Sequence, residues 1–148
     1  MNRFKCPAWS SGLCQPGPLG RLKMQECWYE RGEQMLVYVA GAYRGKSKYR
    51  LINRLQVMRN IYRAWRVARE LWGMGYTVIC PHANSALMDG VAPNETFLKG
   101  DIEMLKKCDG IVMLPGWEYS AGAVREYMVA IDRGMKVMHW DEMEGLRC

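Results

Sequence analysis

The chain has 148 residues, with 21 Lys and Arg against 15 Asp and Glu, which gives a net charge of +6. This length fits one ordinary domain, and 49% hydrophobic with 24% charged residues excludes a disordered chain. No apolar run approaches the roughly 20 residues that a bilayer span needs, so we expect no integral membrane protein. Arg3 and Lys5 are not followed by a signal-peptide apolar stretch, which predicts a cytoplasmic protein with reduced thiols.

The first 34 residues differ in character from the rest of the chain. They are rich in Pro and Gly and show no sustained period, which predicts an irregular extension at 1–34 before an α/β domain at 35–148. Zinc binding by Cys6, Cys14 and Cys27 is an alternative for this segment. We favour no metal, because their spacing contains no Cys-x-x-Cys pair and no His.

Strand and helix patterns alternate through the remainder of the chain. Short apolar runs are typical of strands buried on both faces, and the segments between them have a helical period. This alternation predicts a small doubly wound parallel sheet of four to five strands, flavodoxin-like or Rossmann-like, in three α/β/α layers. The strands are expected at 36–40, 76–80, 110–114 and 136–140, and the helices at 48–74, 95–107 and 120–133.

The three predicted helices each carry an apolar stripe that we expect to face the sheet. The first helix also carries an arginine row at 50, 54, 59, 63 and 66, for which a solvated face is favoured over a nucleic-acid surface. The expected inward residues are Leu51, Leu55, Met58, Tyr62, Trp65 and Trp72 with Val57, Ile61, Ala64, Ala68 and Leu71, then Phe97, Ile102 and Leu105, then Ala123, Tyr127, Ala130 and Ile131.

In open parallel sheets, ligands bind beyond the carboxyl ends of the strands. This rule selects the loops at 41–46, 81–89, 115–120 and 139–141 as candidate site segments. Glycines in the first loop would let backbone amides approach an anion, and its arginine adds a fork of donors. The loop is neither a Walker loop nor a dinucleotide-binding fingerprint, so a phosphate or ribose pocket and an ordinary turn remain open alternatives.

Polar residues near the third predicted strand offer further chemistry. Ser120 is well placed to cap the third helix, and its hydroxyl could also contact a phosphate. Asp101 and Glu126 are the carboxylates of interest, whereas Asp109 is expected to be a structural turn residue. His82 is expected to be a hydrogen-bonding group, because no second His or Cys at ligand spacing supports a metal.

Three motifs in this order resemble a known enzyme superfamily. They are Tyr38-x-x-Gly41-x-x-Arg44-Gly45, Asp101 with Asp109 eight residues on, and Ser120-x-Gly122-x-x-x-Glu126. The set is similar to the nucleoside 2-deoxyribosyltransferase superfamily, above all to its 2′-deoxynucleoside 5′-phosphate N-hydrolase branch and that branch's uncharacterised phage and bacterial relatives. The resemblance spans about 35–140.

The resemblance implies an N-glycosidic bond hydrolase or a base-exchange transferase that acts on 2′-deoxynucleoside 5′-monophosphates. It implies that Glu126 attacks the anomeric carbon and forms a glycosyl ester, which water or another base then resolves. Asp101 would orient the sugar or help to protonate the leaving base, and Tyr38 would hydrogen-bond near the nucleophile. No cofactor is expected.

The resemblance also implies which residues contact the substrate. A phosphate would lie near the start of the third helix, and Tyr43 or Trp117 would form an apolar wall against the base. The segment 82–94 would form a flap over it. The residues expected to bind substrate are Gly41, Tyr43, Arg44, Gly45, His82, Asn84, Trp117, Ser120 and Gly122.

Other functions remain open at this point. The fold could serve a catalytically weak nucleotide-binding or sequestering protein, or an NAD-type nucleotide glycohydrolase, and DNA binding by the arginine row is a more distant alternative. A homodimer or higher homo-oligomer is expected, because the superfamily dimerises and the wide apolar helix faces exceed what a small sheet can cover.

Overall fold

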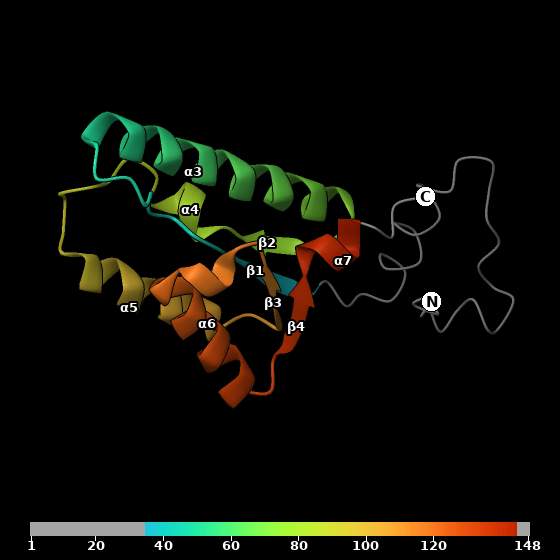
Figure 1. Ribbon diagram of the computed structural model, residues 1–148. Coiled ribbons are helices and arrows are strands. Elements are labelled where there is room, and N and C mark those ends of the chain that lie inside the picture. The colour runs from blue at the N-terminus through green and yellow to red at the C-terminus, as the bar shows by residue number, and fades with distance from the viewer. Residues whose placement is uncertain (1–34, 145–148) are drawn as a thin grey trace, which may run out of the picture. The chain divides into compact units, whose positions relative to one another are not determined.

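The structure, a computed structural model, describes residues 35–144 (Figure 1). The predicted irregular extension and the zinc alternative at its cysteines lie outside the described residues. Within residues 35–144, no helix is both long enough and apolar enough to cross a membrane.

Four parallel strands form the sheet, in the order β2-β1-β3-β4. They are β1 (Leu36–Ala40), β2 (Thr77–Ile79), β3 (Gly110–Met113) and β4 (Lys136–His139). Tyr38, in the middle of β1, lies between Ile79 of β2 and Ile111 of β3. The strand order reverses between β1 and β3, as in flavodoxin-like sheets, and the predicted α/β fold is confirmed.

Helices cover both faces of the sheet and form the outer layers (Figure 1). On one side lie α3 (Arg50–Gly73) and the short α4 (Pro81–Asn84), and on the other lie α5 (Asn94–Leu105) and α6 (Ala121–Asp132). The predicted strands and helices are confirmed to within two residues at each end. The sequence did not predict α4, the 3-10 turn η1 (Trp117–Tyr119), or α7 (Trp140–Glu144).

Each face of the sheet has its own apolar core, because side chains alternate along the strands. Val37 and Val39 of β1 face α3, while Tyr38 and Ala40 face α5 and α6. The predicted core cysteines, Cys80 and Cys108, are both buried free thiols, one in each core.

The prediction for the first stripe of α3 is wrong. Only the second stripe packs against the sheet, where Ala64, Ala68 and Leu71 are buried. Small side chains let a helix backbone come close to a sheet, so this face wins over the face with the bulkier residues. Ile131 of α6 was also expected to face inward and is 50% exposed. The exposed residues of the first stripe are Leu51, Leu55, Met58, Tyr62, Trp65 and Trp72.

Candidate active site

A buried hydrogen bond joins β1 to α6 at the heart of the candidate site. The Tyr38 hydroxyl donates to Oε1 of Glu126 over 2.7 Å, across 88 residues of sequence. Tyr38 is completely buried and Glu126 is 6% exposed. A carboxyl group is seldom buried to this degree without a partner, and here the tyrosine supplies it.

Asp101 of α5 lies close enough to this pair to act on it electrostatically. Burial raises the pKa of Glu126 to about 8; the Tyr38 hydrogen bond opposes this rise and the charge of Asp101 adds to it. Burial also raises the pKa of Asp101 to about 6. The pKa of Tyr38 is raised by burial and then by both carboxylates. The structure therefore brings together the three predicted catalytic residues in one partly desolvated cluster.

Asp109, the other acidic residue of the motif set, has a structural role as expected. Its Oδ2 accepts a hydrogen bond of 2.7 Å from the backbone amide of Leu36, and its own amide donates to the Leu36 carbonyl. These bonds join the beginnings of β1 and β3, at the amino-terminal ends of the strands and away from the candidate site.

The first turn of α6 lies beside Glu126 in sequence and presents backbone donors. Ser120 is the N-cap, as predicted, and its Oγ accepts from the amide of Ala123 at 3.4 Å. Helix geometry leaves the amides of Ala121 and Gly122 without intrahelical acceptors, so they can bind an anion. A Cβ at Gly122 would make only ordinary contacts, the nearest being Leu98 at 3.4 Å, so packing does not demand glycine there.

The loop after β1 is held in place by side chains of α3. Gln56 accepts from the amides of Lys46 and Ser47 at 2.8 and 3.2 Å. Asn60 donates to the carbonyls of Tyr43 and Arg44 at 3.2 and 3.3 Å. The Arg44 side chain is exposed at the surface.

At two positions of this loop, neighbouring side chains lie so close to the backbone that only glycine fits. A Cβ at Gly41 would lie 2.8 Å from Cδ1 of Leu114, and one at Gly45 would lie within 3 Å of both Asn53 and Gln56. Neither position has room for a side chain, so the predicted anion-binding glycines also have a packing role.

A cation from this loop reaches the segment after β3. Nζ of Lys46 lies 4.4 Å from the ring centroid of Tyr119, next to the N-cap Ser120. This cation–π contact brings a positive charge to the start of α6. Sequence reasoning included Lys46 in a candidate loop but gave it no role, because the contact depends on how two distant loops meet.

The predicted base-binding residues Tyr43 and His82 lie together, with ring centroids 5.7 Å apart. His82 is 5% exposed, and neither ring nitrogen has a hydrogen-bond partner among the described residues. Burial lowers the pKa of His82, and the nearby backbone of Gly41 and Ala42 only partly offsets this, so the imidazole is neutral at pH 7. Both ring nitrogens are themselves buried, so the ring would have to move before it could hydrogen-bond a ligand.

The predicted flap contacts Tyr43. Burial raises the pKa of the Tyr43 hydroxyl and the charge of Asp89 raises it further, while a hydrogen bond with the Leu87 backbone lowers it. Leu87 has φ of 63°, which a leucine rarely adopts. The contact therefore holds the flap against the loop after β1 at a residue with backbone strain.

Two predicted binding residues make other contacts. Trp117 packs on Tyr127, with ring centroids 4.5 Å apart, and also lies 6.3 Å from His139. Asn84 donates to Sδ of Met104 at 3.7 Å. Trp117 therefore has one ring already packed on it, and Asn84 contacts α5 through Met104.

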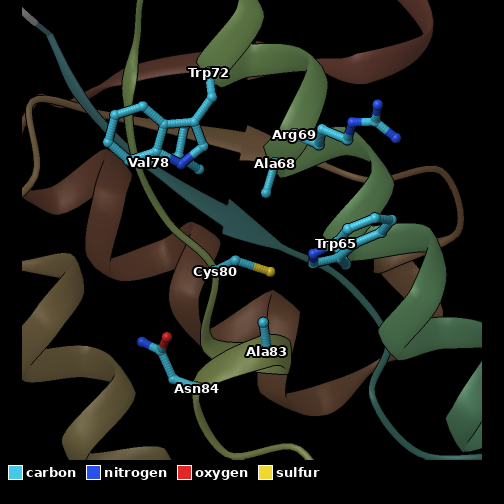
Figure 2. A pocket seen from close by; sticks show the side chains of 8 residues that line it. All are labelled: Trp65, Ala68, Arg69, Trp72, Val78, Cys80, Ala83 and Asn84. Carbon is cyan, nitrogen blue, oxygen red and sulfur yellow. The ribbon is translucent and has the colours of Figure 1, made fainter.

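A groove of about 380 Å³ lies between α3, β2 and α4, apart from the carboxylates. Figure 2 shows Trp65, Arg69 and Trp72 projecting from α3 around Cys80, with Ala83 and Asn84 from α4. Apart from Asn84, its lining includes none of the predicted site residues.

Comparison with known proteins gives a family without an assigned activity. A search of curated proteins finds no match to the chain. One family model, the domain of unknown function DUF4406, matches residues 35–139, which covers all four strands and the three motifs described above. The chain therefore belongs to the DUF4406 family.

Proposed function

We propose that the protein cleaves the N-glycosidic bond of 2′-deoxynucleoside 5′-monophosphates, by hydrolysis or by transfer of the sugar to another base. The single observation that carries this proposal is the buried Tyr38–Glu126 hydrogen bond, with Asp101 in electrostatic contact. Two carboxyl groups around one sugar are the usual means of cleaving a glycosidic bond with a covalent intermediate.

The two carboxyl groups differ in pKa, and their roles in this proposal are those that the superfamily resemblance implies. Asp101, with a pKa of about 6, is mostly ionised at pH 7 and suits a carboxylate that accepts a hydrogen bond from a sugar hydroxyl. Glu126, with a pKa of about 8, is mostly protonated in the free protein. It must lose its proton before it can attack, and the Tyr38 hydroxyl stabilises the ionised form.

The reaction then proceeds in two steps. A carboxylate oxygen of Glu126 bonds to the anomeric carbon, while the electron pair of the broken C–N bond leaves with the base, which takes up a proton from the protonated form of Asp101. In the second step water attacks the same carbon and gives a proton back to Asp101, the ester bond breaks, and Glu126 is released as a carboxylate with deoxyribose 5-phosphate. With a second base as acceptor, the outcome is base exchange.

Groups around Tyr38, Asp101 and Glu126 are suited to bind the 5′-phosphate and the base of such a nucleotide. The α6 amides at Ala121 and Gly122, the Ser120 hydroxyl and the Lys46 ammonium can bind the 5′-phosphate. Tyr43 can contact the base by stacking, and the buried His82 ring lies 5.7 Å from the Tyr43 ring and supports it.

The test is incubation of the full chain with each of the four deoxynucleoside monophosphates, with free base measured by chromatography. Matched ribonucleotides test the NAD-type and ribose alternatives, and nucleosides without phosphate test the phosphate requirement. We expect Glu126→Gln to lower base release by about a thousandfold, since it removes the nucleophile.

The matched control is Glu103→Gln, which changes an exposed glutamate on the same helix as Asp101 and should leave the rate unchanged. Base release by Glu126→Gln at the parental rate contradicts the proposed mechanism. Tight nucleotide binding without base release from any substrate favours the sequestering alternative.

A further inference from the structure

The exposed stripe of α3 has the spacing of a helix-pairing seam. Its positions are 51, 55, 58, 62, 65, 69 and 72, which follow one another in alternating steps of four and three. This heptad spacing is characteristic of helices that pack against another helix, and it is maintained here over three heptads. Six of the seven positions are large apolar residues, and the exception is Arg69.

The area of this stripe is large for a free surface. The six apolar side chains are between 44% and 72% exposed. Together they present on the order of 800 Å², which is about what one partner contributes to a standard interface. Isolated exposed apolar residues need no explanation, but a continuous row along one helix does.

From this stripe we infer that α3 pairs with α3 of a second copy of the chain, in antiparallel orientation, around a two-fold axis near Tyr62. This inference is independent of the proposed function. In that arrangement Leu51 faces Trp72 and Met58 faces Trp65, so each indole packs against an aliphatic side chain. A two-fold axis needs such a self-complementary surface.

Arg69 determines the orientation. In a parallel, in-register pair, the two Arg69 side chains would meet inside the seam, which repulsion and desolvation disfavour. In the antiparallel pair each Arg69 lies opposite Leu55, where its aliphatic stem can pack and its guanidinium can reach solvent. Arg69 already lies over the Trp65 ring, 5.9 Å from its centroid.

Charge predicts how the association responds to salt. The helix carries six arginines and one acidic residue, so two copies repel each other. Salt screens this repulsion, and the dimer should therefore become tighter as salt concentration rises. Binding of a polyanion such as a nucleic acid to the same arginines would instead weaken as salt concentration rises. The direction of the salt effect therefore distinguishes a second copy of the chain from a nucleic acid.

The first experiment measures the mass of the full chain in solution by sedimentation at several salt concentrations. We expect twice the 17.1 kDa chain mass at high salt. Tyr62→Glu should weaken the dimer at least a hundredfold, because the two introduced carboxylates would meet at the two-fold axis. Met128→Glu is the matched control, because Met128 is a similarly exposed apolar residue on α6 and should have no effect.

The second experiment tests the orientation with single cysteines, in a chain whose Cys6, Cys14, Cys27 and Cys148 are serine. Tyr62→Cys should form a disulfide-linked dimer on mild oxidation, because the two copies of residue 62 meet at the axis. Leu51→Cys should not, since the two copies lie roughly 30 Å apart across an antiparallel pair.

Three results overturn the inference. The first is a monomer at all salt concentrations, and the second is a dimer that Tyr62→Glu leaves intact. The third is a monomer that binds a single-stranded oligonucleotide at low salt and loses this binding in Tyr62→Glu, which would assign the stripe to nucleic acid. Cross-linking of Leu51→Cys as efficient as that of Tyr62→Cys overturns the antiparallel orientation.

Discussion

The two layers that cover the sheet depart from ordinary packing in opposite ways. On the α6 side, a carboxyl group is buried at Glu126, where an apolar residue would be more stable. On the α3 side, apolar residues such as Leu51 and Tyr62 are left in solvent, where polar residues would be usual. A buried acid suits chemistry on a small ligand, while an exposed apolar row suits a large partner. Our two proposals follow this contrast, with catalysis in one layer and association in the other.

The largest expected effect concerns the buried acid. Because the pKa of Glu126 is raised from its ordinary 4.5 to about 8, the folded state binds its proton more tightly than the unfolded state. The stability from this group is full below pH 4.5 and is lost as pH rises through 8. Glu126→Gln should therefore be more stable than the parent by about 2–4 kcal/mol at pH 8.5.

Urea unfolding of the two chains at pH 5 and pH 8.5 measures this difference, which should be small at the lower pH. An equal difference at both pH values would show that Glu126 is not kept protonated by folding. The result would also contradict the comparison of the two layers, because burial in the α6 layer would then not raise the pKa of Glu126.

The second effect compares two leucines of α3. Leu71 is fully buried against the sheet, so Leu71→Ala should cost about 3 kcal/mol of unfolding free energy. Leu55 is 61% exposed, so Leu55→Ala should change the stability of the dilute monomer by less than about 0.5 kcal/mol. Denaturant unfolding at low protein concentration measures both. A similar loss in the two variants would mean that the outer stripe packs within the monomer.

Two substitutions around Glu126 should move the pH dependence of base release in opposite directions. Tyr38→Phe removes a hydrogen bond that lowers the pKa of Glu126, so the rise in rate with pH should shift upward. Asp101→Asn removes a negative charge that raises this pKa, so the rise in rate should occur at a lower pH. The maximum rate of this variant should also be lower than that of the parent. We expect Tyr38→Phe to release base roughly tenfold more slowly at pH 7.

The measurement is the rate of base release between pH 5 and pH 10 for each variant. Shifts in the same direction, or none, would mean that ionisation of Glu126 does not limit the reaction.

The smallest expected effect concerns phosphate binding. Lys46→Ala removes the ammonium near the start of α6 and should raise KM for a deoxynucleoside monophosphate by about threefold to tenfold, with kcat nearly unchanged. The same variant should have no effect on a nucleoside without phosphate, and this comparison is the control. A fall in kcat with both substrates would place Lys46 outside the phosphate site.

The order and type of the main elements could be predicted from the sequence, since the apolar runs of buried parallel strands are distinctive. Periodicity could not decide which stripe of α3 faces the sheet, because both have a helical period. The choice depends on steric fit at Ala64 and Ala68. The four-residue helix α4 is too short for any periodic signal, and it begins at a proline that is equally common in turns.

The candidate site could also be predicted only in part from the sequence. Nothing local in the sequence pairs Tyr38 with Glu126, and the resemblance to a known superfamily was needed to select both. Lys46 on Tyr119 and the contact between Tyr43 and Leu87 depend on the meeting of loops from different strands. Such contacts follow from the assembled fold and leave no pattern along the chain.

The amide side chains of Gln56 and Asn60 make α3 more than a cover for the sheet. The helix that carries the outer stripe also holds, through these two residues, the backbone of the loop with Tyr43 and Lys46. A displacement of α3 along its axis therefore moves that loop relative to Glu126. If the pairing that we propose for α3 displaces the helix, it would also change the proposed nucleotide site, and the rate per chain would then depend on protein concentration.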